Sequence, residues 1–192
     1  MSIDYYEKNA DSFYEDTYKV DMSNMYKRFF SHLASGAYIL DAGCGSGRDT
    51  KEFLSLGYKV SAFDASIQMV IRARKLTGVN INLKEFNQIN EKSVYDGIWA
   101  CASLLHVPIA ELISVMQRLA GALKAGGVWY VSFKYGCGER EKDGRHFTDL
   151  DEEGLNRIVK QIESVSILEK WVSEDKRPGH NELWLNAILL KS

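Results

Sequence analysis

Three glycines in alternation follow a short apolar run, in the segment DAGCGSG at residues 41–47. Glycine lets the backbone approach a ligand closely and adopts positive φ without a steric penalty, so Gly43, Gly45 and Gly47 indicate a binding turn. Several nucleotide-binding families use such a turn after a first strand. The segment by itself therefore predicts a nucleotide-like ligand without naming it.

The spacing of these glycines excludes two common phosphate-binding loops. The dinucleotide fingerprint G-x-G-x-x-G requires a third glycine at the position that Arg48 occupies, and its pyrophosphate needs an uncluttered helix start. A Walker A loop needs Gly-Lys-Ser/Thr after the turn, and that sequence is missing here. We therefore do not expect NAD or a nucleoside triphosphate in this turn.

An acidic residue, Asp64, follows the next apolar run, about 20 residues after the first glycine. A carboxylate at that position can accept hydrogen bonds from both hydroxyls of a ribose. The turn and Asp64 together indicate an adenosyl ligand without phosphates. The alternative is that Asp64 caps the following helix, although Ser66 is available for that purpose.

Short apolar runs alternate with helical patterns through most of the chain and must position these residues. Two helical patterns fill 1–35, and strands are predicted at 37–41, 58–63, 79–86, 95–101 and 128–133. Helices are predicted over about 48–56, over a segment that contains Ile67 and ends near Gly78, and from Pro108 to Gly126-Gly127. This alternation predicts an α/β, Rossmann-like, doubly wound and mostly parallel sheet with helices on both faces.

The end of the chain departs from this alternation. A helix around 149–162 precedes two strand-like segments, 165–175 and 182–191, which only the short segment 176–181 connects. A parallel return needs about a dozen residues or more, so these two strands must be antiparallel. We expect an α/β sheet that finishes with an antiparallel C-terminal strand.

In this order and spacing, the motifs resemble class I S-adenosylmethionine-dependent methyltransferases over nearly the whole chain. DAGCGSG matches the first motif of that family, and FDAS at residues 63–66 matches the second. DGIWACASLLHV looks like the fourth-strand motif, and LKAGGVWYVSF is similar to the approach to strand five, with Ala125 in place of proline. The terminal hairpin is similar to the reversed seventh strand of the family.

The resemblance implies S-adenosyl-L-methionine as cofactor and assigns roles residue by residue. Asp41 would steer the loop or meet the amino group through water, and Asp64 would hold the ribose. Arg48 would either pair with the ligand carboxylate or be a solvated helix residue. Asn87 stands where many members place an acidic residue for the adenine amine. The other implied cofactor contacts are Gly43, Cys44, Gly45, Gly47, Ala65, Met69, Cys101 and Ser103.

Methyl transfer needs positioning and, for some acceptors, a base. His106, just past the fourth strand, is the candidate base, and a packed helix-start histidine is the alternative. The helices in 1–35 are expected to cap the site. On them, Tyr14 and Tyr18 are candidate acceptor contacts, because they are offset from the packing stripe that contains Tyr6 and Phe13.

The segment 134–150 is predicted to be a mobile loop beside the acceptor. Its candidate acceptor contacts are Lys134, Tyr135, Arg145 and Phe147, while 139–143 should be solvated. Thr148 with Asp151 is typical of a capping box that starts the next helix.

Composition limits the partners. Lys+Arg 24 against Asp+Glu 26 gives a net charge of −2, so no global basic field favours nucleic acid. No apolar run is long enough to span a bilayer, and the start of the chain lacks the pattern of a signal peptide. Three unclustered cysteines suit a reducing cytoplasm, and no metal site is expected.

These observations predict a single-domain cytoplasmic S-adenosylmethionine-dependent methyltransferase, 1–192, acting on a small-molecule acceptor as a monomer or homodimer. An RNA or protein methyltransferase is one alternative, and a non-catalytic S-adenosylmethionine-binding protein is another. The compact size is similar to that of the tellurite-resistance methyltransferase group, although no residue identifies tellurite or any other acceptor.

Overall fold

The first five strands alternate with helices, as the sequence predicts. The computed structural model describes residues 2–177 and 179–192. Two helices come first, α1 (Ser2–Thr17) and α2 (Ser23–Phe30). The alternating part consists of β1 (Tyr38–Ala42), α3 (Arg48–Ser55), β2 (Lys59–Asp64), α4 (Ile67–Thr77), β3 (Asn82–Leu83), β4 (Tyr95–Ala100), α5 (Ile109–Ala122) and β5 (Leu123–Lys134). The C-terminal part consists of β6 (Gly138–Lys142), β7 (Arg145–Asp149), α6 (Glu152–Val159), β8 (Val165–Glu174) and β9 (Leu183–Lys191).

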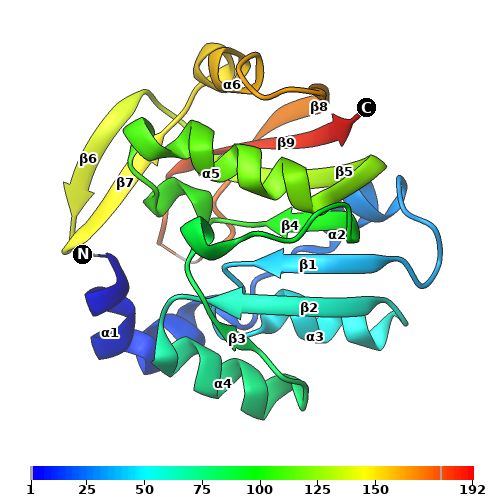
Figure 1. Ribbon diagram of the computed structural model, residues 1–192. Coiled ribbons are helices and arrows are strands. Elements are labelled where there is room, and N and C mark those ends of the chain that lie inside the picture. The colour runs from blue at the N-terminus through cyan, green and yellow to red at the C-terminus, as the bar shows by residue number, and fades with distance from the viewer. Residues whose placement is uncertain (1, 178) are drawn as a thin grey trace.

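Seven strands form one twisted sheet in the order β3-β2-β1-β4-β5-β9-β8 (Figure 1). Neighbours from β3 to β5 are parallel, whereas β9 is antiparallel to both β5 and β8. The predicted fold class, including the reversed C-terminal strand, is confirmed. The connection between β8 and β9 contains Pro178, which lies outside the described residues.

Each face of the sheet carries its own apolar layer, because successive side chains of a strand point to opposite faces. On β1, Leu40 packs in the layer formed with α5 and α6, and Ile39 packs in the opposite layer with Phe29 of α2 and Phe53 of α3. Both layers are almost completely buried. A rigid sheet covered on both faces leaves the carboxyl ends of its strands as the place for a binding site.

Two elements lie beyond that carboxyl edge. Figure 1 shows α1 next to the ends of β1, β2 and β4, with the β6–β7 hairpin on the same side of the molecule. Helix α1 changes direction at Asn9, whose φ and ψ of −117° and 21° are not helical. The kink divides α1 into two short segments.

Several predicted boundaries move. Helix α5 ends at Ala122, four residues before Gly126-Gly127, because Leu123 already pairs with Tyr95 of β4 as the first residue of β5. The third strand contains two residues rather than eight. A single 3-10 turn, Phe86–Gln88, replaces its end, and Glu85 and Gln88 cap this turn reciprocally.

The prediction of a loop over 134–150 is wrong for its central part. Residues 138–142 and 145–149 form a two-stranded hairpin, and the pairing of Lys142 with Arg145 leaves Asp143 and Gly144 as its turn. Both turn residues have positive φ, 53° and 73°, as a tight hairpin turn requires. Most of 139–143 is nevertheless exposed, as expected.

The predicted capping box is also wrong. Thr148 is buried in β7 and donates its hydroxyl proton to the Val107 carbonyl oxygen, at 2.8 Å. Asp151 is itself the N-cap of α6, and its carboxylate accepts from the Gly154 amide at 2.7 Å. The helix therefore starts three residues later than the Thr148 pattern indicates.

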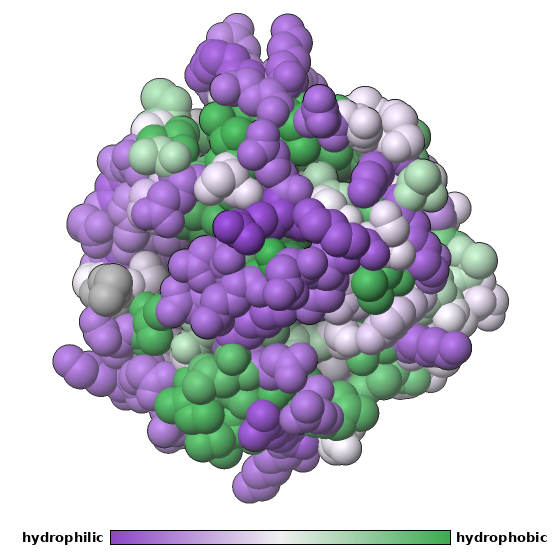
Figure 2. All heavy atoms as spheres, viewed as in Figure 1, coloured by the Kyte–Doolittle hydropathy of each residue, from purple (hydrophilic) through white to green (hydrophobic). Residues whose placement is uncertain are grey.

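The face shown in Figure 2 is largely hydrophilic, and apolar residues gather at its lower edge, where Figure 1 places α4. Ile67 and Ile71 of that helix are among the exposed large apolar residues. Among the described residues, no helix combines the length and the hydropathy that crossing a bilayer demands.

Candidate functional site

The glycine turn connects β1 to α3 at the centre of the carboxyl edge, where the strand order reverses between β1 and β4. Gly43, Gly45 and Gly47 all have positive φ, at 78°, 55° and 89°. A Cβ on Gly43 would lie 2.5 Å from the Cβ of Ser103, in the loop after β4. Glycine is therefore required there for the two loops to approach each other, whereas a Cβ on Gly45 would lie at an ordinary contact distance of 3.8 Å from Phe13.

Asp64 at the end of β2 supports the same turn. Its carboxylate accepts from the Gly45 amide and from the Ser66 amide, each at 2.9 Å. Burial raises the pKa of Asp64, and the three backbone donors around it oppose that shift. Ser66 is the N-cap of α4 and accepts from the Met69 amide, so Asp64 is not needed for capping.

A cavity of about 860 Å³ lies over the glycine turn, and we refer to it as the larger cavity. Its volume falls in the range of about 300–1,000 Å³ that is typical of small-molecule sites. It is lined by ten of the twelve predicted cofactor contacts, namely Gly43, Cys44, Gly45, Arg48, Asp64, Ala65, Met69, Asn87, Cys101 and Ser103. Bare glycine backbone, a carboxylate and the apolar Met69 and Phe86 together fit an adenosyl group.

The other two predicted cofactor contacts, Asp41 and Gly47, do not line the larger cavity. Asp41 is 2% exposed and accepts a hydrogen bond from Thr50 of α3 at 2.5 Å, so it anchors the helix behind the turn. Burial, and next the charge of Asp49, raise the pKa of Asp41 to about 8. Gly47 packs against α4, where an added Cβ would lie 3.0 Å from Ala73.

Arg48 is neither solvated nor free. Its guanidinium forms a bidentate pair with Asp49, at 2.6 and 3.0 Å, and donates to the Thr17 carbonyl at 3.2 Å. Asp49 also accepts from the Tyr26 hydroxyl and the Trp99 indole, at 2.5 and 2.7 Å. Burial raises the pKa of Asp49, but its hydrogen bonds and the Arg48 charge outweigh this and lower it overall. The buried charge of Arg48 is thus compensated by one carboxylate.

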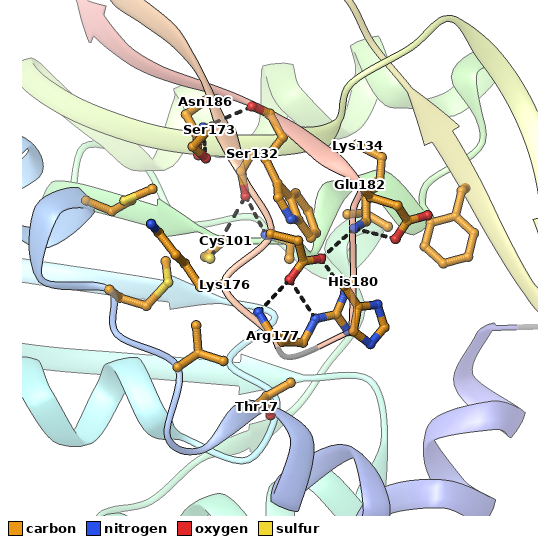
Figure 3. A pocket seen from close by; sticks show the side chains of 18 of the residues that line it. Thr17, Cys101, Ser132, Lys134, Ser173, Lys176, Arg177, His180, Glu182 and Asn186 are labelled. Carbon is orange, nitrogen blue, oxygen red and sulfur yellow. Dashed lines mark hydrogen bonds and ion pairs between the residues drawn. The ribbon is translucent and has the colours of Figure 1, made fainter.

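A second cavity of about 180 Å³, the smaller cavity, adjoins the larger one. The residues that line both are Tyr6, Phe13, Thr17, Arg48, Cys101, Ala102 and His106. Three of the four predicted acceptor contacts on 134–150, Lys134, Arg145 and Phe147, line the smaller cavity. Figure 3 shows the charged wall that β5 and the β8–β9 connection build there.

That wall is an ion-pair network around Lys134. The ammonium group lies 2.9 Å from Asp175 and 2.7 Å from Glu182, and it also lies over the Trp184 ring at 3.9 Å. Arg177 forms two further hydrogen bonds to Asp175, at 3.0 and 2.6 Å (Figure 3). The pKa of Asp175 is held well below its usual range by Arg177 and Lys134, against the effect of burial.

Asp175, His180 and Glu182 bring ligand-type atoms within 4.8 Å of one another, which is close enough to hold a cation. The Lys134 ammonium group already bridges the two carboxylates of this trio. Because that charge occupies the place a metal ion would neutralise, the donor set does not fit a resident metal.

His106 lies at the junction of the two cavities, and its hydrogen bonds determine its tautomer. Nδ1 lies 2.7 Å from the His146 carbonyl oxygen, which can only accept, so Nδ1 carries the proton. Nε2 is then a free acceptor for the Tyr6 hydroxyl, at 2.7 Å. Burial lowers the pKa of His106 to about 4, so the imidazole is neutral at pH 7.

Cys101, also at the junction, is a thiol rather than a nucleophile. Burial raises the pKa of Cys101 to about 12. The Ser132 hydroxyl, 3.9 Å from its sulfur, also accepts from the Ala102 amide at 2.8 Å.

The structure does not bring Tyr14, Tyr18 or Tyr135 to either cavity. Tyr14 and Tyr18 stack on each other at 4.8 Å, and Tyr135 donates to Glu152 of α6 at 2.9 Å. No contact among the described residues places them beside an acceptor, so their assignment as acceptor contacts stays a prediction. Tyr6 and Phe13, which the sequence analysis assigned to packing, line both cavities because their stripe of α1 faces the site.

Sequence reasoning also missed Phe86 and the carboxylates Asp175 and Glu182 of the β8–β9 connection. Phe86 lines the larger cavity and meets Phe63 edge to face at 5.3 Å. The sequence feature that could have identified Phe86 is its position as an aromatic residue at the carboxyl end of the third predicted strand. Asp175 and Glu182 gave no signal, because their partner Lys134 is distant in sequence.

Comparison with known proteins agrees with this geometry. A family model described as a methyltransferase domain matches residues 39–127, which run from β1 to the start of β5. A ubiquinone biosynthesis O-methyltransferase from Xanthomonas axonopodis pv. citri is 29% identical over 105 residues, covering 51% of this chain and 43% of the relative. The chain thus spans less than half the length of that relative.

Solved structures share the fold over nearly the whole chain. One is the Burkholderia thailandensis 1,6-didemethyltoxoflavin-N1-methyltransferase, solved with that compound and S-adenosylhomocysteine, at 20% identity and a TM-score of 0.80. The match covers 99% of this chain and 85% of the other. Another is a TehB-like S-adenosylmethionine-dependent methyltransferase from Corynebacterium glutamicum, at 16% identity, a TM-score of 0.73, and 98% and 100% coverage. Residues 39–127 thus match a methyltransferase domain, and nearly the whole chain shares the fold of solved S-adenosylmethionine-dependent methyltransferases.

Proposed function

We propose that this class I methyltransferase transfers a methyl group from S-adenosyl-L-methionine to a small-molecule acceptor that binds in the smaller cavity. The observation that carries the proposal is the junction of two cavities. The larger one lies over the glycine turn, and the smaller one adjoins it where His106 and Tyr6 meet. An acceptor in the smaller cavity would lie next to the part of the cofactor that faces the junction from the larger cavity.

The chain's own residues would bind and orient both reactants. The Gly43 and Gly45 backbone admits the cofactor closely, Asp64 accepts from its ribose hydroxyls, and Met69 and Phe86 flank its adenine. When bound, the cofactor supplies an electrophilic methyl group on a sulfonium centre. Tyr6, Phe13 and Thr17 of α1 line the junction, where they would keep water away from the reacting groups.

His106 is the proposed base. Its Nε2 is unprotonated at neutral pH and accepts a hydrogen bond from the Tyr6 hydroxyl at the junction. A base with a pKa of about 4 is weak, which suits an acceptor whose proton becomes acidic only as the new bond to carbon forms. Because Tyr6 occupies that Nε2, Tyr6 would take the acceptor's proton on its oxygen while passing its own hydroxyl proton to His106.

The size of the acceptor space supports a small molecule over RNA or protein. The cavity of about 180 Å³ is lined by α1, by β7 and by the β8–β9 connection, among other elements. Its cations are largely matched by carboxylates, and the chain carries a net charge of −2. Neither feature favours a phosphate backbone.

Cofactor binding is tested by thermal unfolding. S-adenosyl-L-methionine should raise the melting temperature, since a ligand that binds only the folded state stabilises it, whereas NAD should not. Asp64→Asn should weaken cofactor affinity about tenfold or more, because hydrogen bonds to a charged acceptor are worth about 1.5–3 kcal/mol. Glu153→Gln, at an exposed position of α6, is the matched control and should bind as the wild type does.

The same samples separate the rival functions. Release of S-adenosylhomocysteine with small acceptors supports the proposal, while release only with RNA or protein would contradict it. Cofactor binding without any release would indicate a non-catalytic binding protein. Unchanged affinity in Asp64→Asn would refute the ribose contact.

A further inference from the structure

Arg145 is a buried cation on the acceptor side with an unused donor. It is the first residue of β7, it lines the smaller cavity, and its side chain is 15% exposed. Within the described residues, its Nε is one of two buried side-chain atoms without a hydrogen-bond partner. A buried donor that has lost water and gained nothing destabilises the free protein, so such an atom indicates a missing partner.

The nearest carboxylate does not supply that partner. Asp143, in the hairpin turn, lies 3.6 Å from Nη2 of Arg145 and is itself 62% exposed. An exposed ion pair at that distance contributes little, because solvent screens it. The Arg145 charge therefore stays largely uncompensated on its buried side.

Two aromatic rings hold the guanidinium plane. Its Cζ lies 4.1 Å from the centroid of the Tyr5 ring and 5.2 Å from that of Phe147. Aromatic faces occupy the faces of a guanidinium and leave its donors, which lie in the plane, for an anion. A planar carboxylate is the group that this arrangement matches, since it can accept two parallel hydrogen bonds.

The other buried cations of the smaller cavity are already matched. Lys134 contacts Asp175 and Glu182, Arg177 contacts Asp175, and Arg48 contacts Asp49, all at 2.6–3.0 Å. Arg145 is the exception. It also lies close enough to the junction for its charge to lower the pKa values of both Tyr6 and His106.

We propose that Arg145 binds an anionic group of the methyl acceptor, with a carboxylate as the best match. The proposal rests on the proposed function, because it takes the smaller cavity as the acceptor site. Arg145 lines the smaller cavity and not the larger one, so its anion belongs to the acceptor rather than to the cofactor. An acceptor bound there places its anionic group on β7 and the rest of the molecule towards His106.

The test is a titration with benzoate and its uncharged counterpart benzamide. The protein is saturated with S-adenosylhomocysteine, and the ¹⁵N–¹H signal of the Arg145 Nε is identified by its absence in Arg145→Lys. Benzoate should shift this signal along a saturable curve, and benzamide should not. Arg145→Gln should weaken benzoate binding about tenfold or more, as expected for the loss of a charge-assisted hydrogen bond. Its S-adenosylhomocysteine affinity should stay unchanged.

Arg157→Gln is the control, because Arg157 lies on α6, is 69% exposed and pairs only with Glu153. It should retain both affinities. The proposal is overturned if the Arg145 Nε signal does not shift with benzoate or shifts equally with benzamide. It is also overturned if Arg145→Gln binds benzoate as tightly as the wild type does. If S-adenosylhomocysteine bound neither the wild type nor any variant, the proposed function would be refuted instead. Failure of the Arg145 proposal is therefore distinguishable from failure of the proposed function.

Discussion

At the scale of single residues, the site depends on buried groups whose protonation is determined by their partners. His106 donates from Nδ1 to a backbone carbonyl and, as the neutral imidazole, accepts at Nε2 from Tyr6. Protonation of Nε2 would reverse the bond to Tyr6, whose hydroxyl oxygen would then accept, and would bring a second positive charge next to Arg145. Burial, and also the Arg145 charge, hold the base neutral by lowering its pKa, while the orienting bond to the His146 carbonyl opposes them.

This arrangement predicts a pH dependence of stability. The pKa of His106 falls from 6.5 to about 4 on folding, so between these values the unfolded chain binds a proton that the folded protein does not. The free energy of unfolding that His106 contributes should therefore fall as the pH drops from about 6.5 to 4, by roughly 3 kcal/mol in total. Above pH 6.5 it should be constant.

His106→Gln removes the titrating group and tests this prediction. Urea denaturation at about pH 5 and pH 7 should show a smaller pH dependence in the variant than in the wild type. Turnover should also fall more than cofactor affinity. Parallel stability curves would show that the imidazole is not held neutral, and unchanged turnover would refute the role as a base.

Sequence reasoning located residues at the cavity where the backbone positions them, and it failed where helix docking decides which face meets the cavity. Asp64 and the glycines lie where the strand ends place them, so ten of the predicted cofactor contacts line the larger cavity. The helical stripe of α1 was recognised, but its direction was not. Sequence periodicity groups Tyr6 with Phe13, whereas only the docked helix shows that this stripe faces the cavities.

At the scale of elements, the turn from β1 to α3 has two separate requirements for glycine. Gly43 allows the loop after β4 to approach, and Gly47 allows α3 to pack against α4. An added Cβ at Gly47 would lie 3.0 Å from both Cα and Cβ of Ala73. Gly57, at the end of α3, has a similar φ of 85° but nothing within 4 Å.

Gly47→Ala and Gly57→Ala form a matched pair. Both variants should lose about 1 kcal/mol of unfolding free energy, because alanine is strained at positive φ. Gly47→Ala should lose about 1–3 kcal/mol more, since the overpacked contact with Ala73 forces α3 and α4 apart. Urea denaturation midpoints measure the difference. Equal losses of unfolding free energy in the two variants would mean that α4 shifts to accommodate the added Cβ at no energetic cost.

The β6–β7 hairpin is the element that sequence did not predict. Its strands carry mostly charged residues, since β6 is GEREK, so no alternation of apolar and polar residues distinguishes them from a loop. The Asp143-Gly144 pair was the available signal, because that dipeptide favours a two-residue hairpin turn. The buried side of β7 follows from its contact with the loop after β4, which is distant in sequence.

At the scale of the whole molecule, the sheet was predictable because its strands are continuous apolar runs with helices between them. The reversed β9 followed from a short connection. How α1 docks was not predictable, because it is held mainly by polar contacts between distant segments. Glu7 accepts from the Ser66 hydroxyl at 2.7 Å, Asp11 pairs with Arg72, and Ser2 accepts from the His146 amide at 3.0 Å.

These contacts predict that α1 opens locally and that the cofactor closes it. Ala10 is its one buried residue among those described, so little apolar packing resists opening. A cofactor in the larger cavity would contact the wall that Tyr6, Phe13 and Thr17 form. Amide hydrogen exchange in 2–17 should therefore slow when S-adenosylhomocysteine binds, while exchange in α6, which lines neither cavity, should not change.

Two variants of α1 test the docking contact itself. Glu7→Gln weakens the contact with the start of α4, so 2–17 should exchange faster in the free protein and S-adenosylhomocysteine should dissociate several-fold faster. Glu15→Gln, at an exposed position of the same helix, should behave like the wild type. If S-adenosylhomocysteine left the exchange of 2–17 unchanged, α1 would not be a cap. Helix α1 would then belong to the site only as a fixed wall, and ligands would enter by the β6–β7 side.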